Sequence, residues 1–283
     1  MRLTRIRIHP VKSFAGADHA AARVRPWGLE GDRRWGVVDP DGKPVTAREA
    51  HGLLGLTAEP TADGVRLSAR DGADDLFVPE PAGAVAVPVG HSRQGSALPA
   101  GPLADAWLTD RIGRPLRLVW QPDPGTRTVR TDLGGLPGDR LSLADAAPLL
   151  LASEASLARL GELALTDALE RGETDAPALV IERFRPNLVI DGDPSEPFAE
   201  EAWSSVRIGG VRFRVMVPCD RCVMTTIDPT TLEGGKEPIR TLARHRRRDG
   251  KTWFGIWLVP DLAGSDTDAV AVGDPVSAHG PRG

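Results

Sequence analysis

The sequence predicts a mainly β protein with some helices, an α+β fold, and two observations lead to this class. The first is a series of short runs in which apolar and polar residues alternate, which is the period of a half-buried strand. The second is the abundance of turn residues between these runs, with 31 Gly and 25 Pro in 283 residues. Many short strands separated by Gly and Pro favour a barrel or a sandwich.

Four such runs lie in the first third of the chain. In residues 4–9, Ile6 and Ile8 alternate with arginines, which predicts a strand with one buried face. A run over 35–38 meets the turn sequence DPDG, in which Pro fixes φ and Gly accepts a positive φ. Residues 65–69 and 76–78 continue the pattern. This third is therefore expected to consist of short strands joined by turns.

A segment rich in Gly, Pro and Asp follows, from about residue 98 to residue 148. Its centre, QPDPGTRTVRTDLGGLPGD, has the composition of a long connection. Because domain boundaries fall in such segments, we expect one domain over residues 1–122 and a second over residues 123–283.

Helical and strand patterns both occur in the second domain. Ser153 can cap a helix whose Leu157, Leu160 and Leu163 recur at helical spacing. Residues 187–190 predict a strand.

A hairpin is predicted further on, because two alternating apolar runs, 206–208 and 211–217, flank a Gly-Gly pair. The second strand of this hairpin leads directly to Cys219. Pro238 can begin a short helix that extends to Arg248, with the arginines of 244–248 on its solvent-exposed face. The tail after Pro275 is expected to be frayed.

Composition and charge limit the classes of function. A formal net charge of -4 gives no broad electrostatic reason to bind nucleic acid or an anionic membrane. The first residues lack the apolar stretch of a signal peptide, and no segment approaches the roughly 20 apolar residues that span a bilayer. Two cysteines also argue against a secreted disulfide framework. We therefore expect a cytoplasmic protein with no nucleic-acid or membrane partner.

Both cysteines lie in one short stretch, VPCDRCVMTTIDP, over residues 217–229. They could be buried apolar side chains, although Asp220 and Arg221 between them are charged. A closed zinc site needs four ligands, and the nearest histidine, His245, is far along the chain. A dithiol redox pair usually lies at a helix N-terminus, whereas β-branched residues follow here. A further interpretation is a thiolate ligand of a soft metal, favoured by the charge of Arg221, with other ligands from a cofactor.

Six motifs, in order, resemble the MOSC family with its N-terminal β-barrel domain: PVKSFAG, GLEGDRRW, VTAREAHGLLGL, FRPNLVI, PCDRCVMTTIDPTT and KEPIRTL. The resemblance runs from about residue 2 to residue 276. That family includes the mitochondrial amidoxime-reducing component and its bacterial relatives. The resemblance implies an N-terminal β-barrel-like domain followed by a MOSC β-barrel domain.

The same resemblance implies a molybdenum cofactor of the molybdopterin type, anchored by its phosphate, whose dithiolene gives the metal two sulfurs. In the family pattern the second cysteine, here Cys222, is the protein ligand of the metal and the catalytic residue. Asp220 and Arg221 occupy positions that line the cofactor, and Cys219 is then a neighbour.

A phosphorylated pterin needs a cationic, hydrogen-bonding cradle built from Lys, Arg and short hydroxyls. The positions that the family pattern assigns to this cradle are Lys12, Ser13, Arg33, Arg185 and Asn187.

Two further residues are candidates with plainer alternatives. Ser153 lies at a predicted helix start, where free amides favour an anion, and simple capping of the helix is the alternative. His9 is a candidate proton donor, with a surface position at a strand end as the alternative.

By resemblance, the reaction is two-electron reduction of N-hydroxylated or N-oxygenated small molecules. The sequence has no cysteines to spare for an iron–sulfur cluster, so electrons are expected from a separate donor protein, ferredoxin-like or cytochrome/flavin-reductase-like. One alternative is a molybdenum cofactor carrier or sulfur-relay protein that uses Cys222. Another is a dithiol oxidoreductase, which would need both thiols.

Overall fold

The computed structural model describes residues 1–70, 72, 74–91, 94–176 and 178–281. Within these residues the largest sheet has nine strands, ordered β19-β14-β15-β17-β12-β13-β1-β2, with β16 beside β17. Their bounds are β1 (Leu3–Ile8), β2 (Ala17–His19), β12 (Leu149–Ser153), β13 (Leu188–Ile190), β14 (Trp203–Ile208), β15 (Val211–Asp220), β16 (Arg247–Arg248), β17 (Lys251–Pro260) and β19 (Val276–Pro281).

Three smaller sheets complete the β structure of the described residues, in the orders β5-β11-β10-β9, β6-β7-β8 and β18-β3-β4. Their bounds are β3 (Ala21–Arg25), β4 (Gly28–Leu29), β5 (Trp35–Val38), β6 (Leu56–Thr61), β7 (Gly64–Ala69), β8 (Leu76–Pro79), β9 (Val87–Val89), β10 (Gly95–Pro99), β11 (Arg117–Trp120) and β18 (Ala269–Ala271). The α-helices are α1 (Pro102–Ile112), α2 (Glu154–Glu170) and α3 (Ile239–His245). The fold is mainly β with some helices, as predicted.

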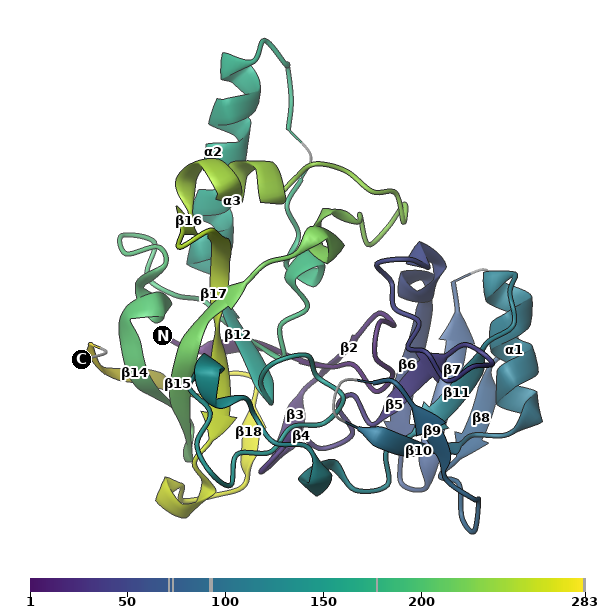
Figure 1. The fold of residues 1–283 in the computed structure, drawn as a ribbon. Coiled ribbons are helices and arrows are strands. Elements are labelled where there is room, and N and C mark those ends of the chain that lie inside the picture. Colours follow the sequence, from purple (N-terminus) through teal and green to yellow (C-terminus); the bar gives the residue numbers. More distant parts are fainter. Residues whose placement is uncertain (71, 73, 92–93, 177, 282–283) are drawn as a thin grey trace.

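Figure 1 shows two lobes side by side. The N-terminal lobe holds the sheets β5-β11-β10-β9 and β6-β7-β8 with α1, and the main lobe holds the nine-stranded sheet with α2 and α3. Each lobe has its own hydrophobic core: Trp35, Leu67 and Leu118 belong to one, and Leu151 and Phe213 to the other.

The first strands of the chain belong to the main lobe. β1 pairs antiparallel with β13, Leu3 opposite Ile190, and Leu3 and Ile6 are buried in the core of the main lobe. β3 pairs with β18 near the C-terminus. The boundary near residue 122 stays a prediction. A division of the chain at that residue would assign β1 to β4 to the N-terminal lobe, but these four strands lie outside it.

Conversely, one segment from the C-terminal part of the chain packs onto the N-terminal lobe. Ile227 is buried in the core of that lobe, with Met224 and Leu232 packed against it. The Leu232 carbonyl lies 3.0 Å from Nδ1 of His51, in the 3-10 helix η1 (His51–Gly55). The residues that follow Cys222 therefore hold this thiol beside the N-terminal lobe.

Most predicted elements of the sequence are confirmed. β1, β5, β7 and β8 lie where the four short runs predict strands, and the hairpin turns at Gly209-Gly210, with Ile208 paired to Val211. Between β11 and β12, the structure has only the 3-10 helices η2 (Pro124–Thr126) and η3 (Thr131–Leu133), so this part is a long connection.

Two expectations are wrong, and one helix was not predicted. Helix α1 was not predicted because Pro102 and Gly113, which stand at its start and its left-handed end, are also common turn residues. Residues 276–281 of the tail are not frayed, since β19 pairs with β14. The arginines of 244–248 do not share a helix face, because α3 ends at His245 and the Arg246 guanidinium lies 3.8 Å from the centre of the Phe198 ring. No helix among the described residues is long and apolar enough to cross a bilayer.

Candidate active site between the two lobes

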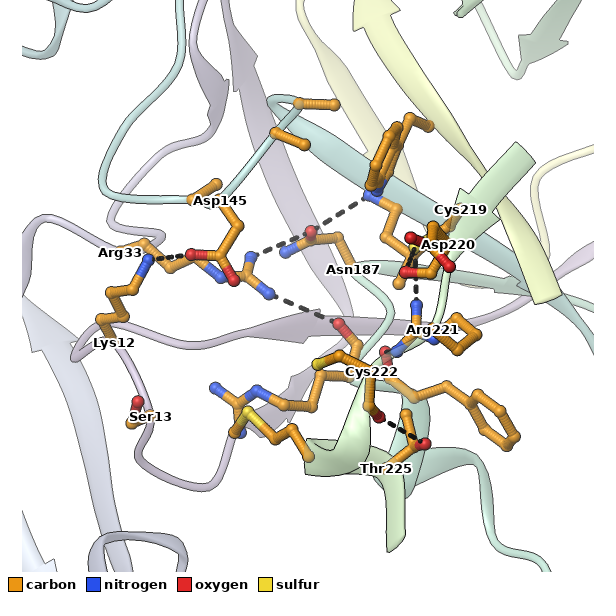
Figure 2. Close-up of a pocket in the computed structure, with 18 of the residues that line it drawn as sticks. Lys12, Ser13, Arg33, Asp145, Asn187, Cys219, Asp220, Arg221, Cys222 and Thr225 are labelled. Carbon is orange, nitrogen blue, oxygen red and sulfur yellow. Dashed lines mark hydrogen bonds and ion pairs between the residues drawn. The ribbon is translucent and has the colours of Figure 1, made fainter. Parts of the chain in front are cut away.

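Side chains from both lobes line a cavity of about 330 Å³. Eight of the nine predicted site residues contribute to its wall: Lys12, Ser13, Arg33, Arg185, Asn187, Asp220, Arg221 and Cys222. In Figure 2, Lys12, Ser13 and Asp145 lie on one side of this space, and Asp220, Arg221 and Cys222 on the other, with Asn187 between them. The structure therefore brings together residues that are more than two hundred positions apart in the sequence.

Lys12 and Ser13 lie in the turn that follows β1. The Lys12 backbone N–H donates to the Trp35 carbonyl, which fixes this turn on the N-terminal lobe. Its ammonium donates to the Leu143 carbonyl at 2.7 Å and forms an ion pair with Asp145. Burial lowers the pKa of Lys12, although Asp145 opposes this effect.

Three cradle residues have left-handed backbone conformations. The φ angles are 75° at Ser13, 48° at Arg33 and 55° at Arg185. Such conformations are uncommon for residues other than glycine and cluster at active sites and ligand clamps, where the surrounding structure holds them. Three of the six non-glycine residues with a positive φ in the described part of the chain thus belong to the predicted cradle.

A buried ion pair holds Arg33 in place. Asp32, 1% exposed, pairs with the Arg33 guanidinium and accepts a hydrogen bond from the His9 amide at 2.8 Å. Although burial raises the pKa of Asp32, Arg33 and His9 outweigh that effect and hold it below its usual value. The guanidinium also donates to Asn187 Oδ1 at 3.1 Å and so spans the two lobes.

The surface position expected for His9 is wrong. The side chain is 2% exposed and packs against Gly16, where a Cβ atom would lie 2.6 Å from the imidazole ring. Burial, with Arg185 and Arg33 nearby, holds the pKa of His9 well below its usual value. His9 is not among the described residues that line the cavity.

Arg185 and Asn187 flank the start of β13. The Arg185 guanidinium donates to the Phe14 carbonyl at 2.7 Å, and burial followed by the charge of Arg33 lowers its pKa to about 9. Asn187 is 1% exposed and donates from Nδ2 to the Arg7 carbonyl at 3.2 Å. Asn187 therefore ties β13 to β1 while its oxygen orients Arg33.

The two cysteines have different surroundings. Cys219, at the end of β15, is buried, and its sulfur lies 2.7 Å from Arg221 Nη1. Arg221 also donates from Nη2 to the Phe184 carbonyl at 2.8 Å. Burial raises the pKa of the Cys219 thiol, and Arg221 opposes this effect. Cys222 is exposed and precedes the 3-10 helix η6 (Val223–Thr226).

Ser153 is not brought to the cavity. It is the N-cap of α2, and its hydroxyl accepts a hydrogen bond from the Ser156 amide at 3.4 Å. The capping alternative is confirmed.

Sequence reasoning missed three charged residues of the wall, Arg48, Asp145 and Arg183. Asp145 Oδ1 faces Lys12, and Asp145 Oδ2 lies 3.4 Å from Arg48 Nη2. Burial would raise the pKa of Asp145, but Lys12, Arg48 and Arg33 lower it to about 2. Arg48 lies within the motif VTAREAHGLLGL, which was a signal for it, whereas Asp145 lies at the end of the segment that was interpreted as a connection.

Comparisons with known proteins agree with the motifs. The model of the MOSC domain matches residues 138–277, and that of the MOSC N-terminal beta barrel domain matches residues 1–115. The chain is 32% identical to mitochondrial amidoxime-reducing component 1 of Homo sapiens over 95% of this chain and 80% of that protein. This chain belongs to the MOSC family.

Other known proteins are also similar. Molybdenum cofactor sulfurase of Danio rerio is 32% identical over 95% of this chain, which spans only 33% of that protein. The solved structure of the YUAD protein of Bacillus subtilis covers 99% of this chain and 96% of its own, at 14% identity and a TM-score of 0.41. That likeness is too distant to inform the site.

The site of this MOSC protein has features that suit a phosphate-anchored metal cofactor. Lys12, Ser13 and Arg33 offer cationic and hydroxyl donors for a phosphate, and the cavity volume is in the range of small-molecule sites. No group of three or more His, Cys, Asp or Glu side chains that could hold a metal ion occurs in the described part of the chain. A soft metal at Cys222 must therefore bring most of its ligands with it, as a dithiolene does.

Proposed function

We propose that this MOSC protein binds the molybdenum cofactor in the cavity between its lobes and reduces N-hydroxylated or N-oxygenated small molecules. The observation that carries the proposal is an exposed cysteine, Cys222, at the wall of a cavity whose other charged groups are mainly cationic. When bound, the cofactor supplies the two-electron redox chemistry that removes oxygen from the substrate. A separate electron-donor protein completes the reaction.

The protein residues have separate roles in this proposal. Lys12, Ser13 and Arg33 bind the phosphate, while Arg185 and Asn187 orient the pterin. Cys222 supplies the protein thiolate, and Arg221, locked between Cys219 and the Phe184 carbonyl, lines the cavity beside it. These donors are already ordered by the protein, so little rearrangement is needed on binding.

A cofactor carrier or sulfur-relay function is the second candidate, since molybdenum cofactor sulfurases are among the similar proteins. In that case Cys222 would hold the cofactor or a persulfide without reducing a small molecule.

The test is the composition and turnover of protein purified from a host that makes the cofactor. We expect about one molybdenum and one pterin per chain, and reduction of benzamidoxime with a chemical electron donor. Full molybdenum content without turnover of any N–O compound would favour the carrier. Protein with zinc and no molybdenum would contradict both candidates.

A further inference from the structure

The cationic side chains that line the cavity differ in whether their donors are already engaged. Among the described residues there are six: Lys12, Arg33, Arg48, Arg183, Arg185 and Arg221. Five of them donate to a protein oxygen at 3.1 Å or less, the acceptors being Leu143, Asn187, Asp228, Phe14 and Phe184. The contact of Arg48 with Asp145 is longer, 3.4 Å.

Arg48 is also much more accessible than its neighbours. Its side chain is 48% exposed, compared with 17% for Lys12 and 12% for Arg33. A guanidinium with half of its surface in water and donors to spare can bind an incoming molecule without first breaking a short hydrogen bond.

Arg48 and Cys222, the proposed metal ligand, line the same cavity. Asp145 places one oxygen toward Lys12 and the other toward Arg48, so it separates the phosphate-binding end from the guanidinium. Arg48 comes from the N-terminal lobe, between β5 and η1, and Cys222 from the main lobe.

We propose that Arg48 binds the oxygen of the substrate N–O group and selects substrates in which that oxygen carries negative charge. The favoured class is N-oxides and ionised hydroxamates, and the disfavoured class is neutral hydroxylamines. The inference rests on the proposed function, because the oxygen to be removed must approach the metal held by Cys222. Charge-assisted hydrogen bonds from a guanidinium are stronger than bonds to a neutral oxygen, which gives the selectivity its physical basis.

Binding without turnover tests this role directly. Molybdenum-loaded protein, without any electron donor, is titrated by calorimetry with pyridine N-oxide and with N-phenylhydroxylamine. Arg48→Met should raise the dissociation constant of pyridine N-oxide at least roughly tenfold, as expected for loss of one charge-assisted hydrogen bond. The constant for N-phenylhydroxylamine should change by less than about threefold, since its oxygen is neutral. Arg48→Lys keeps the charge, so its dissociation constant for pyridine N-oxide should lie between those of the wild type and of Arg48→Met.

Arg114→Met is the matched control. The Arg114 side chain is 44% exposed, lies 3.5 Å from Glu49 and is absent from the cavity wall. This variant removes the same charge from the same lobe, so an effect of net charge on folding or cofactor loading would appear in both variants. Arg114→Met should leave both dissociation constants and the molybdenum content unchanged.

Three results would overturn the inference. The first is that the wild type does not bind pyridine N-oxide, and the second is that Arg48→Met loses affinity equally for both ligands. The third is that Arg48→Met loses molybdenum, which would make Arg48 a cofactor ligand. Selective, Arg48-dependent binding in a protein that reduces no N–O compound would instead refute the proposed reductase function and leave the binding role in place.

Discussion

Replacing the two cysteines separately should distinguish a sulfur that stabilises the fold from one that serves the chemistry. Cys219 is 4% exposed, and its sulfur accepts a hydrogen bond from the Arg221 guanidinium, whose Nε is buried without a partner. Cys222 is exposed, and its carbonyl accepts a hydrogen bond from the Thr225 hydroxyl at 3.0 Å. The two positions therefore predict opposite phenotypes.

The magnitudes follow from these contacts. Cys219→Ala removes an acceptor from a charged donor in a buried place, which should cost about 1.5–3 kcal/mol of unfolding free energy. Cys219→Ser retains an acceptor oxygen and should cost about 1 kcal/mol. Cys222→Ser changes an exposed side chain and should stay within about 0.5 kcal/mol of the wild type.

Two measurements on each variant give the comparison. Denaturant unfolding of the cofactor-free protein reports stability, and molybdenum content with benzamidoxime reduction reports the site. Cys222→Ser should lose reductase activity because a hydroxyl replaces the soft thiolate ligand. Cys219→Ser should retain metal and much of its activity, with some change from altered hydrogen bonding near the metal ligand.

The reasoning has a clear refutation. Equal loss of activity in Cys219→Ser and Cys222→Ser would indicate a dithiol mechanism, in which both sulfurs form the disulfide. Retained activity in Cys222→Ser would remove the assignment of the metal ligand.

Three other substitutions test the cradle and the residues behind it. Arg185→Ala should reduce cofactor affinity by about 1.5–3 kcal/mol, measured as pterin released per chain, and full occupancy would contradict its role. Asp32→Asn removes the buried carboxylate that pairs with the partly buried Arg33 guanidinium and should cost about 1.5–3 kcal/mol at neutral pH. Folding lowers the pKa of Asp32, so the stabilisation by this carboxylate is present above pH about 4, near its unfolded pKa, and is lost as the pH falls further. The difference in unfolding free energy between wild type and Asp32→Asn, measured by denaturant unfolding, should therefore become smaller below pH about 4. A difference that does not change with pH would refute the ion pair. Gly16→Ala places a methyl group against the buried His9 ring and should cost about 1–3 kcal/mol in thermal unfolding, and an unchanged melting temperature would show that the ring can move away.

Local patterns accounted for a large part of the fold. Alternation located β1, the DPDG turn marked the end of β5, and a cap with helical leucine spacing located α2, because these signals depend on neighbours a few residues apart. Helix α1 was missed since Pro and Gly serve both turns and helix ends, and only the intervening hydrogen bonds distinguish them. β19 was missed because a strand at the end of the chain is stabilised by its partner β14 and by little in its own sequence.

The site divides in a similar way. Motif resemblance pointed to residues such as Lys12 and Cys222, which the structure places on one cavity wall. It did not point to Asp145, whose importance comes from the cations around it. It also did not reveal that His9 is buried, since that depends on the space left by Gly16.

The sequence by itself determined the mainly β class, the hairpin that ends at Cys219, and the family through its ordered motifs. Only the tertiary structure decided that the two thiols differ, one buried against Arg221 and one exposed beside Arg48. Only the tertiary structure, likewise, distinguished the cations with short hydrogen bonds to protein oxygens from Arg48, whose side chain is half exposed and whose contact with Asp145 is longer. The physical reason is that strand period and turn chemistry act between near neighbours, whereas burial, charge and hydrogen-bond satisfaction depend on segments that folding brings together from both lobes.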